Sequence, residues 1–258
     1  MNRSRELSFE ECKRLQLEIL NEVDNVCREH SISYSLAFGT LLGAIRHKGY
    51  IPWDDDLDIM MPYEEMCKLR NILNSSDISF FDIDTDKSYG NPFGNICSNR
   101  TFRKIGRKIE RGLGIDVYPI VKIPNNLEEQ VVFFNKAAIL QSKRKIAISA
   151  RMFLLKRFSF SPNLGYYRTI KNYRDFLVSH NNSSSNLYYI IAGPLEMREK
   201  MIYDKNIFDE LIVAEFEGKT YPIIKEYDYF LNLRYGNYMQ LPPENQRHPY
   251  HGQHYYWK

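Results

Sequence analysis

Four aspartates fall within five positions of the chain: Asp54, Asp55, Asp56 and Asp58. In an extended segment, residues two apart share one face, so Asp56 and Asp58 point the same way, and Asp54 joins them if the strand begins that early. Carboxylates held about 6–7 Å apart repel each other, and folding would not favour them without a cation. Oxygen ligands of this kind suit Mg²⁺ or Mn²⁺, which take their remaining ligands from water and substrate phosphates. The spacing therefore predicts a divalent-metal site.

Two other interpretations of the acidic run are weaker. The first is a solvated acidic turn. Such a turn is not normally framed by many apolar residues, whereas the acidic run has them on both sides between Ile51 and Met60. A calcium loop of the EF-hand type needs glycine at its sixth position, but Ile59 stands there, and Pro62 breaks its second half.

A small residue and a hydroxyl residue, Gly39 and Thr40, precede the run between a predicted strand and a predicted helix. At a helix N-terminus, such a pair lets N–H groups and a hydroxyl approach a phosphate, although Gly-Thr alone is typical of an ordinary turn. Followed by carboxylates on the next strand, it matches the nucleotidyltransferase arrangement, whose third carboxylate lies on a neighbouring strand. Asp116 is our candidate for that position. The alternative is a half-buried aspartate that accepts a backbone N–H.

Further candidate substrate contacts flank the acidic run. Arg46, His47 and Lys48 could hold a diphosphate and stabilise charge on a leaving phosphate, or they form an ordinary basic turn. Trp53 is more typical of packing than of a ring that contacts a base or choline, although quaternary ammonium groups favour aromatic faces. His251 is a candidate proton shuttle, but a lone histidine near a C-terminus is more often a surface residue.

Hydrophobic spacing and turn residues indicate the elements that must position these side chains. Ser8 and Glu11 fit a capping box at the start of a helix over residues 8–30. Further predicted elements of the first 120 residues are strands at 33–38, 54–61, 80–84 and 115–120, helices at 41–46 and 63–73, and a hairpin at 100–114. Strands separated by helices indicate an α/β or α+β domain.

The second half of the chain changes in character. Residues 130–174 hold ten Lys or Arg and no Asp or Glu, and we expect a helix there at least through Arg157. This segment is either a solvated positive face or a peripheral contact for anionic lipid or an acidic lipid-linked glycan. The remaining predicted elements are a polar linker at 181–186, a strand at 188–192, a hairpin at 215–221 turned at Gly218, and a helix at 223–235 closed by Gly236.

The composition excludes several classes of protein. The 258 residues are 43% apolar, enough for a core, and a net charge of +3 argues against a nucleic-acid coat. An acidic run that repels phosphate and the lack of a recognition motif make us expect no nucleic-acid partner. The four scattered cysteines form no zinc or disulfide spacing. Because the sequence has neither a signal-peptide core nor about 18 consecutive apolar residues, we expect a cytoplasmic protein, at the inner membrane face if its basic segment binds lipid.

Residues 38–59, FGTLLGAIRHKGYIPWDDDLDI, are similar to the signature of the LicD family of phosphotransferases, which includes bacterial phosphocholine transferases and eukaryotic fukutin-type ribitol-phosphate transferases. Residues 115–119, IDVYP, resemble its second motif, and the segment from Tyr235 to His251 resembles its closing YG-x-x-M-x-x-PP segment. Two positions depart from the pattern: Asn237 stands where Asp is common, and residues 248–251, HPYH, replace an adjacent histidine pair.

The resemblance covers about residues 9–252. It implies an α+β fold with a nucleotidyltransferase-like mixed sheet flanked by helices. We therefore expect a single domain over residues 1–258. Its predicted parts are a core at 1–121, a basic helical insertion at 122–180, and C-terminal strands and a hairpin-helix at 187–258.

The resemblance also implies transfer of a phosphorylated alcohol, for which we expect phosphocholine from CDP-choline, to a hydroxyl of a lipopolysaccharide, teichoic acid or capsule precursor. The hydroxyl would attack the distal phosphate in line, and CMP would leave. Asp56 and Asp58 would hold Mg²⁺ or Mn²⁺, and Asp116 would complete the metal site or accept the hydroxyl proton. The alternative is a nucleotidyltransferase that moves a nucleoside monophosphate onto a sugar or small molecule, because it would use the same carboxylates.

Overall fold

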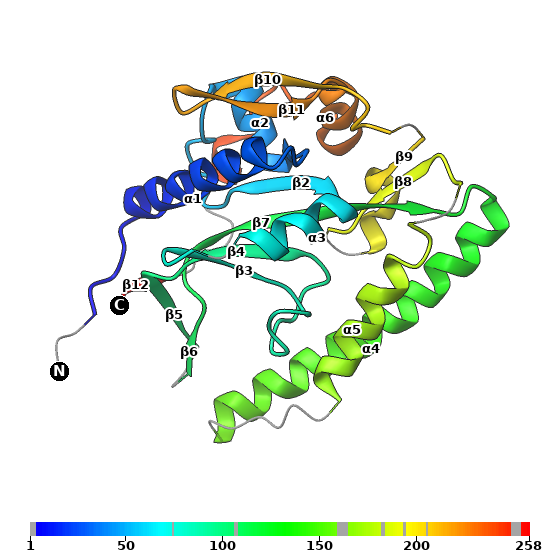
Figure 1. Ribbon diagram of the computed structural model, residues 1–258, viewed down its shortest axis with the longest axis horizontal. Coiled ribbons are helices and arrows are strands. Elements are labelled where there is room, and N and C mark those ends of the chain that lie inside the picture. The colour runs from blue at the N-terminus through cyan, green and yellow to red at the C-terminus, as the bar shows by residue number, and fades with distance from the viewer. Residues whose placement is uncertain are drawn as a thin grey trace.

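The computed structural model describes residues 4–73, 75–105, 108–158, 165–181, 184–192, 195–204, 206–248 and 254–258. Within these residues, six α-helices accompany one seven-stranded mixed sheet, a two-stranded sheet and a three-stranded sheet (Figure 1). The predicted α+β class, with a mixed sheet and helices, is confirmed. No helix of the described ranges is both long and apolar enough to cross a bilayer.

The large sheet is organised around its longest strand, β7 (Gly114–Ile123). On one side β7 pairs in parallel with β2 (Asp58–Pro62), and on the other side it pairs antiparallel with β4 (Gly94–Ser98). The outer strands are β1 (Ser35–Leu36), β3 (Ile78–Phe81), β8 (Leu187–Ile190) and β9 (Ile202–Tyr203). Strands that pair with a neighbour on both sides, as β2 and β7 do, hold their residues in fixed positions, which is what a catalytic side chain requires.

Two helices of the first half cover the sheet. α1 (Phe9–Glu29) and α3 (Tyr63–Ile72) both pack against β7 (Figure 1). The predicted capping box is confirmed, since the Glu11 N–H donates to Ser8 Oγ and the Ser8 N–H donates to the Glu11 carboxylate. A third helix, α2 (Phe38–His47), lies beside β2.

The second half supplies a helical pair and two small sheets. α4 (Leu127–Phe158) and α5 (Tyr166–Leu177) lie side by side along one flank of the molecule, with the Phe133 and Phe176 rings stacked at 4.9 Å (Figure 1). The two-stranded sheet pairs β10 (Leu211–Phe216) with β11 (Lys219–Ile224), and α6 (Tyr227–Tyr235) follows it. In the three-stranded sheet, β5 (Thr101–Ile105) pairs with both β6 (Lys108–Glu110) and β12 (Tyr255–Trp257). Short 3-10 helices span Leu195–Met201 and Glu244–Gln246.

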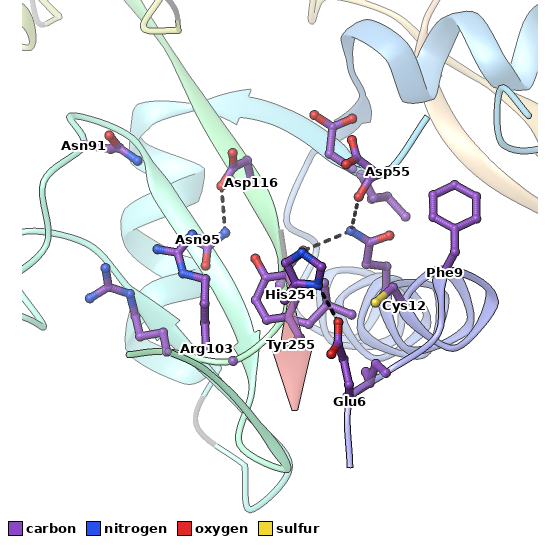
Figure 2. Close-up of a pocket in the computed structure, with 18 of the residues that line it drawn as sticks. Glu6, Phe9, Cys12, Asp55, Asn91, Asn95, Arg103, Asp116, His254 and Tyr255 are labelled. Atoms are coloured by element: carbon purple, nitrogen blue, oxygen red, sulfur yellow. Dashed lines mark hydrogen bonds and ion pairs between the residues drawn. The ribbon is translucent and has the colours of Figure 1, made fainter. Parts of the chain in front are cut away.

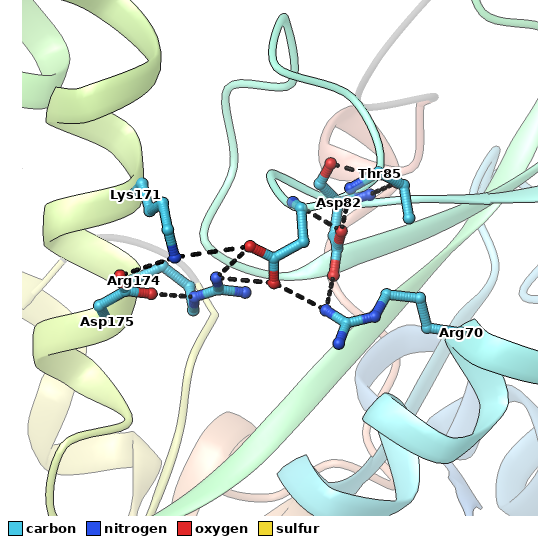
Figure 3. A network of polar contacts seen from close by, with 7 residues as sticks. Arg70, Asp82, Thr85, Lys171, Arg174 and Asp175 are labelled. Carbon is cyan, nitrogen blue, oxygen red and sulfur yellow. Dashed lines mark hydrogen bonds and ion pairs between the residues drawn. The ribbon is translucent and has the colours of Figure 1, made fainter.

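An ion-pair network ties α5 to the sheet. Asp84, just after β3, contacts Arg174 at 2.8 Å and Arg70 of α3 at 2.7 Å, and Arg70 also contacts Asp82 at 2.8 Å (Figure 3). Lys171 lies 3.6 Å from Asp84. Only 3% of the Arg174 side chain is exposed, so this network is part of the packed interior between α5 and α3.

Several predicted boundaries are wrong. The strand expected at 54–61 begins only at Asp58, because the Asp54 N–H donates to the Ile51 carbonyl and closes a turn. The strand expected at 33–38 contains only Ser35–Leu36, and α2 already begins at Phe38, so Gly39 and Thr40 lie in its first turn. The helix expected at 223–235 begins at Tyr227, since Ile223 and Ile224 pair with β10.

One further boundary is wrong and several other predictions are confirmed. β3 lies at 78–81 rather than at 80–84, because the Asp84 N–H donates to Asp82 Oδ1 and closes a turn there. The hairpins turned between β5 and β6 and at Gly218 are confirmed, as are the long helix through Arg157 and the C-terminal Gly236 cap of α6. Residues 182–183 of the expected linker lie outside the described residues.

Candidate active site

Asp58 and Asp116 occupy paired positions of the parallel strands β2 and β7. The Asp116 N–H donates to the Leu57 carbonyl at 3.0 Å, which fixes this register. Residues paired in this way on adjacent strands project from the same face of the sheet. The predicted placement of Asp116 on a strand next to the acidic run is confirmed, while its role in chemistry stays a prediction.

Asp58 is the most deeply buried member of the acidic run, with 6% of its surface exposed. Burial raises its pKa well above the ordinary value, and the carboxylates of Asp56, Asp116 and Asp54 raise it further, against the opposing effect of Arg234. Among the described residues, its Oδ1 atom has no hydrogen-bond partner. A buried carboxylate oxygen without a partner is costly, so this position fits a cation ligand.

Asp54 lies against the start of α2. A Cβ atom on Gly39 would stand 2.6 Å from Asp54 Oδ2, so a larger residue here would have to displace the Asp54 carboxylate. Burial, and then the neighbouring Asp56 carboxylate, raise the pKa of Asp54 to about 7. Phe38, the first residue of α2, has a φ of 44°, a left-handed conformation that a large L-residue adopts only when its surroundings enforce it.

Thr40 connects the first turn of α2 to β2. Its Oγ1 accepts a hydrogen bond from the Asp58 N–H at 2.9 Å, and the residue is 3% exposed. The Ala37 N–H in turn donates to the Asp58 carbonyl at 3.0 Å. The Gly39–Thr40 pair therefore holds the acidic segment in place, and its predicted contact with a phosphate stays a prediction.

A cavity of about 510 Å³ lies next to the acidic segment, and neither Asp54 nor Asp58 is among its lining residues. Asp55 and Asp56 line it from the loop before β2, and Asp116 faces it from β7 (Figure 2). Asn95 of β4 donates through Nδ2 to Asp116 Oδ1 at 2.7 Å, which orients that carboxylate, and Tyr118 OH lies 3.3 Å from its other oxygen. The cavity is therefore acidic along the side formed by β2 and β7.

Basic and aromatic residues that the sequence analysis did not single out complete the wall. Arg103 and Arg111 line the cavity from the hairpin region, and Arg103 pairs with Glu110 at 3.0 Å. The aromatic members of the wall are Phe9, Tyr89 and Tyr255. The Gly-punctuated basic stretch at 100–114 was the available sequence signal for the two arginines. Nothing local indicated Tyr255, because only the pairing of β12 with β5 brings it here.

Another arginine, Arg234, lies near Asp58. The Arg234 guanidinium, at the end of α6, sits 5.2 Å from the centre of the Phe38 ring and is the cation that opposes the raised pKa of Asp58. Its position in the sequence, directly before the Tyr235–Gly236 motif, was a signal that the sequence analysis did not use. α6 and α2 thus meet at the acidic segment.

The predicted cations before the acidic run have structural contacts instead of lining the cavity. Arg46 donates to the carbonyls of Tyr238 at 2.6 Å and Gln240 at 3.4 Å, which ties α2 to the C-terminal segment. Its Nε also donates to His47 Nε2 at 2.9 Å. Lys48 is the exposed C-cap of α2, with a φ of 60°.

Trp53 is half-buried between two side chains. The Arg247 guanidinium lies 5.6 Å from its ring, and the His47 ring meets it edge-on at 6.4 Å. These contacts agree with the packing interpretation of Trp53. His251 lies outside the described residues.

The described residues contain no group of three or more His, Cys, Asp or Glu side chains arranged to hold a metal ion. Mg²⁺, however, is commonly bound through one or two protein carboxylates, with water and substrate phosphates as its other ligands. The unpartnered Oδ1 of Asp58 fits such a partial site. Asp56 and Asp116 are the candidate companion ligands, because they line the cavity and their charges raise the pKa of Asp58.

The chain is similar to proteins of a known family. The family described as LicD/FKTN/FKRP, nucleotidyltransferase domain, matches residues 31–163, which include Asp56, Asp58 and Asp116. The lipopolysaccharide cholinephosphotransferase LicD of Haemophilus influenzae is 27% identical over 270 residues, covering 98% of this chain and 99% of that protein. The uncharacterized protein RP689 of Rickettsia prowazekii is 34% identical over 80 residues, 31% of this chain and 28% of that protein.

Proposed function

This chain belongs to the LicD/FKTN/FKRP family and is a transferase, and we propose that it moves phosphocholine from CDP-choline to a hydroxyl of lipopolysaccharide or a related cell-surface glycan precursor. The full-length similarity to a lipopolysaccharide cholinephosphotransferase supports phosphocholine as the transferred group and lipopolysaccharide as the acceptor. The observation that carries the proposal is the buried, unpartnered carboxylate oxygen of Asp58 in register with the cavity-facing Asp116.

In the proposed reaction, the acceptor hydroxyl oxygen bonds to the distal phosphorus of CDP-choline as the bond from that phosphorus to the bridging oxygen breaks. CMP leaves with the bridging oxygen. The hydroxyl proton passes to Asp116 or, if Asp116 is engaged as a ligand, to water. Asn95 supports either role, because its donated hydrogen bond fixes the Asp116 carboxylate without removing it from the cavity.

A divalent ion, Mg²⁺ or Mn²⁺, would be held by Asp56 and Asp58, with Asp116 as the third candidate ligand. When bound, it would neutralise the diphosphate and the charge on the leaving CMP. Arg103 and Arg111, on the cavity wall, would orient the phosphates through charge-assisted hydrogen bonds. The N–H groups of the first turn of α2, at Gly39 and Thr40, would add a positive helix end, as in a nucleotidyltransferase-like core.

Choline is favoured among the possible alcohols by the cavity wall. A quaternary ammonium is attracted to aromatic faces and to carboxylates. The cavity presents both kinds of group, with the Tyr255 ring lying among Glu6, Asp55 and Asp56. Lys13 already lies over the Phe9 ring at 4.4 Å and Arg111 over the Tyr89 ring at 4.8 Å. A sugar or ribitol group carries no positive charge and would gain no comparable attraction to these carboxylates.

The proposal is tested by incubating the protein and Mg²⁺ with CDP-choline, CDP-ethanolamine, CDP-ribitol and a set of UDP- and GDP-sugars, with a lipopolysaccharide acceptor. Acceptor-dependent CMP release with CDP-choline, together with labelled choline on the acceptor, is the expected result. A nucleotidyltransferase would instead require a nucleoside triphosphate and release pyrophosphate. Release of pyrophosphate alone, or no turnover with any CDP-alcohol by the folded protein, would contradict the proposal.

A further inference from the structure

An apolar line runs along the solvent side of α4. Its members recur every seven residues and are largely exposed, at 67%, 58%, 69% and 65%: Val132, Ile139, Ile146 and Phe153. A seven-residue step rotates a straight α-helix by only about 20°, so these four side chains share one side over most of a helix that is ~48 Å long. We call this line the α4 stripe.

The opposite side of α4 already forms its contacts with the protein. Phe133, Phe134 and Ala137 are buried, and Gln141 Nε2 donates to Tyr173 OH on α5 at 3.4 Å. α4 lies at the outer flank of the molecule with α5 on its inner side (Figure 1). The α4 stripe is therefore a second apolar surface of the same helix, additional to the one that packs.

Basic side chains accompany the stripe. Lys136, Lys143 and Lys145 are all exposed on α4, and residues 130–174 contain no acidic residue. An apolar line flanked by lysines is the pattern of a helix lying in a membrane interface, where apolar side chains enter the lipid and ammonium groups reach anionic headgroups.

The residues beside the stripe argue against a second copy of this chain as the occupant. A coiled coil needs two apolar positions in each heptad. The position three residues after each stripe member is polar, as at Asn135, Ser142 and Ser149. Pairing two such helices would also bring their lysines together, whereas an anionic lipid surface neutralises them.

α4 is connected directly to the cavity wall. Arg144 donates through Nε to the Gly90 carbonyl at 2.7 Å and through Nη2 to Asn91 Oδ1 at 2.9 Å. Arg151 donates to the Ser88 carbonyl at 2.6 Å. Tyr89 and Asn91 of this same segment line the cavity. α4 therefore supports one wall of the cavity from its inner side while its stripe faces outward.

We propose that the α4 stripe binds the surface of an anionic phospholipid bilayer, with the helix lying in the interface instead of crossing it. Bound in this way, the protein holds its cavity close to the membrane in which a lipid-linked acceptor is embedded. This consequence for the acceptor rests on the proposed function, but binding of the bilayer does not.

The test is flotation of the full chain with vesicles of phosphatidylethanolamine and phosphatidylglycerol, and with vesicles of phosphatidylcholine alone, at low and high salt. We expect binding to the phosphatidylglycerol vesicles that high salt weakens, and at least five-fold less binding for Ile139→Glu/Ile146→Glu. Val213→Glu, at a site 62% exposed on β10, is the matched control and should float like the wild type. Replacing Lys136, Lys143 and Lys145 with Gln should weaken binding. Replacing Lys68, Lys219 and Lys225 with Gln should leave binding unchanged.

Flotation needs neither donor nor turnover, so it separates this inference from the proposed function. Circular dichroism and the melting temperature show whether each variant is folded. Salt-insensitive flotation, equal flotation of the double variant and the Val213 control, or no flotation of the wild type would overturn the inference. The inference would also be overturned if the wild type sediments as a dimer and binds no vesicles, while the double variant sediments as a monomer.

Discussion

Asp58 and Asp116 project from the same face of the β2–β7 pair, although they come from distant parts of the chain. The two carboxylates have different surroundings: Asp58 is buried with an unpartnered Oδ1, and Asp116 is half-buried with Asn95 as its donor. Asp58 therefore fits a cation ligand, and its strand neighbour Asp116 faces the cavity.

Asp58→Asn and Asp116→Asn should each lower turnover of CDP-choline by about 10²-fold or more, because an amide cannot supply the negative charge that binds a cation or accepts a proton. Asp58→Asn should not reduce the free energy of unfolding in metal-free buffer, since it removes a buried charge. The measurement is CMP release beside urea unfolding. Asp77→Asn, at an exposed position, is the control, and near-normal turnover by folded Asp58→Asn would exclude a catalytic role.

Mg²⁺ or Mn²⁺ should raise the melting temperature, because an ion that binds only the folded state adds about 2.7 kcal/mol of stability at one hundred times its dissociation constant. For a chain of this size that corresponds to a shift of roughly 5–10 °C. The shift should disappear in Asp58→Asn and after chelation. An equal shift in wild type and Asp58→Asn, measured with and without CMP, would place the ion elsewhere.

Gly43→Ala separates helix propensity from packing. Within α2, propensity alone predicts that alanine stabilises the protein by about 1 kcal/mol. The structure predicts the opposite, because an added Cβ would collide with the Gly49 carbonyl oxygen, a backbone atom that cannot rotate away. We expect a loss of about 1–3 kcal/mol in urea unfolding.

Gly49→Ala is the companion variant. Its Cβ would meet only the end of the Glu217 side chain, which can move, so its loss of stability should be smaller. A Gly43→Ala protein that is more stable than wild type would show that the contact between α2 and residue 49 is looser than described.

Arg174→Ala should lower the free energy of unfolding by about 3–5 kcal/mol, because it removes a buried partner from Asp84. The loss should fall towards the lower value, since Arg70 and Lys171 still face Asp84. Arg168→Ala, at an exposed position of the same helix, should change stability by no more than about 0.5 kcal/mol. Similar unfolding curves for the two variants would contradict a structural role for the network in Figure 3.

The same network should contribute to acid sensitivity. Burial alone would raise the pKa of Asp84, but Arg174, Lys171 and Arg70 outweigh it and leave the pKa below the ordinary 3.8. A lowered pKa means that the carboxylate stabilises the folded state above pH 3.8 and that this contribution is lost as the pH falls through the folded pKa. Asp84→Asn should therefore be less stable than wild type near neutral pH, and the difference should shrink below pH 3.8 in urea unfolding. A difference that stays constant over this range would exclude titration of Asp84 as its cause.

Local spacing was enough to predict much of this protein. The capping box of Ser8 and Glu11, the turn at Gly218 and the end of α6 at Gly236 each depend on residues within a few positions of one another. An acidic residue inside an apolar strand was also enough to single out Asp116. These features follow from the sequence because their physical causes, hydrogen bonds of a helix end and alternation along a strand, are local.

Contacts between distant segments decided the rest. β2 begins at Asp58 and not at Asp54 because its pairing with β7 starts at Asp58 and its pairing with β1 starts at Ile59. Arg46 donates its hydrogen bonds to the carbonyls of Tyr238 and Gln240. Tyr255 enters the cavity wall because β12 returns to pair with β5. The sequence by itself determined which carboxylates are the candidates for the chemistry. The tertiary structure decided which cations and rings surround them, because the free energy of those contacts depends on segments that meet only after folding.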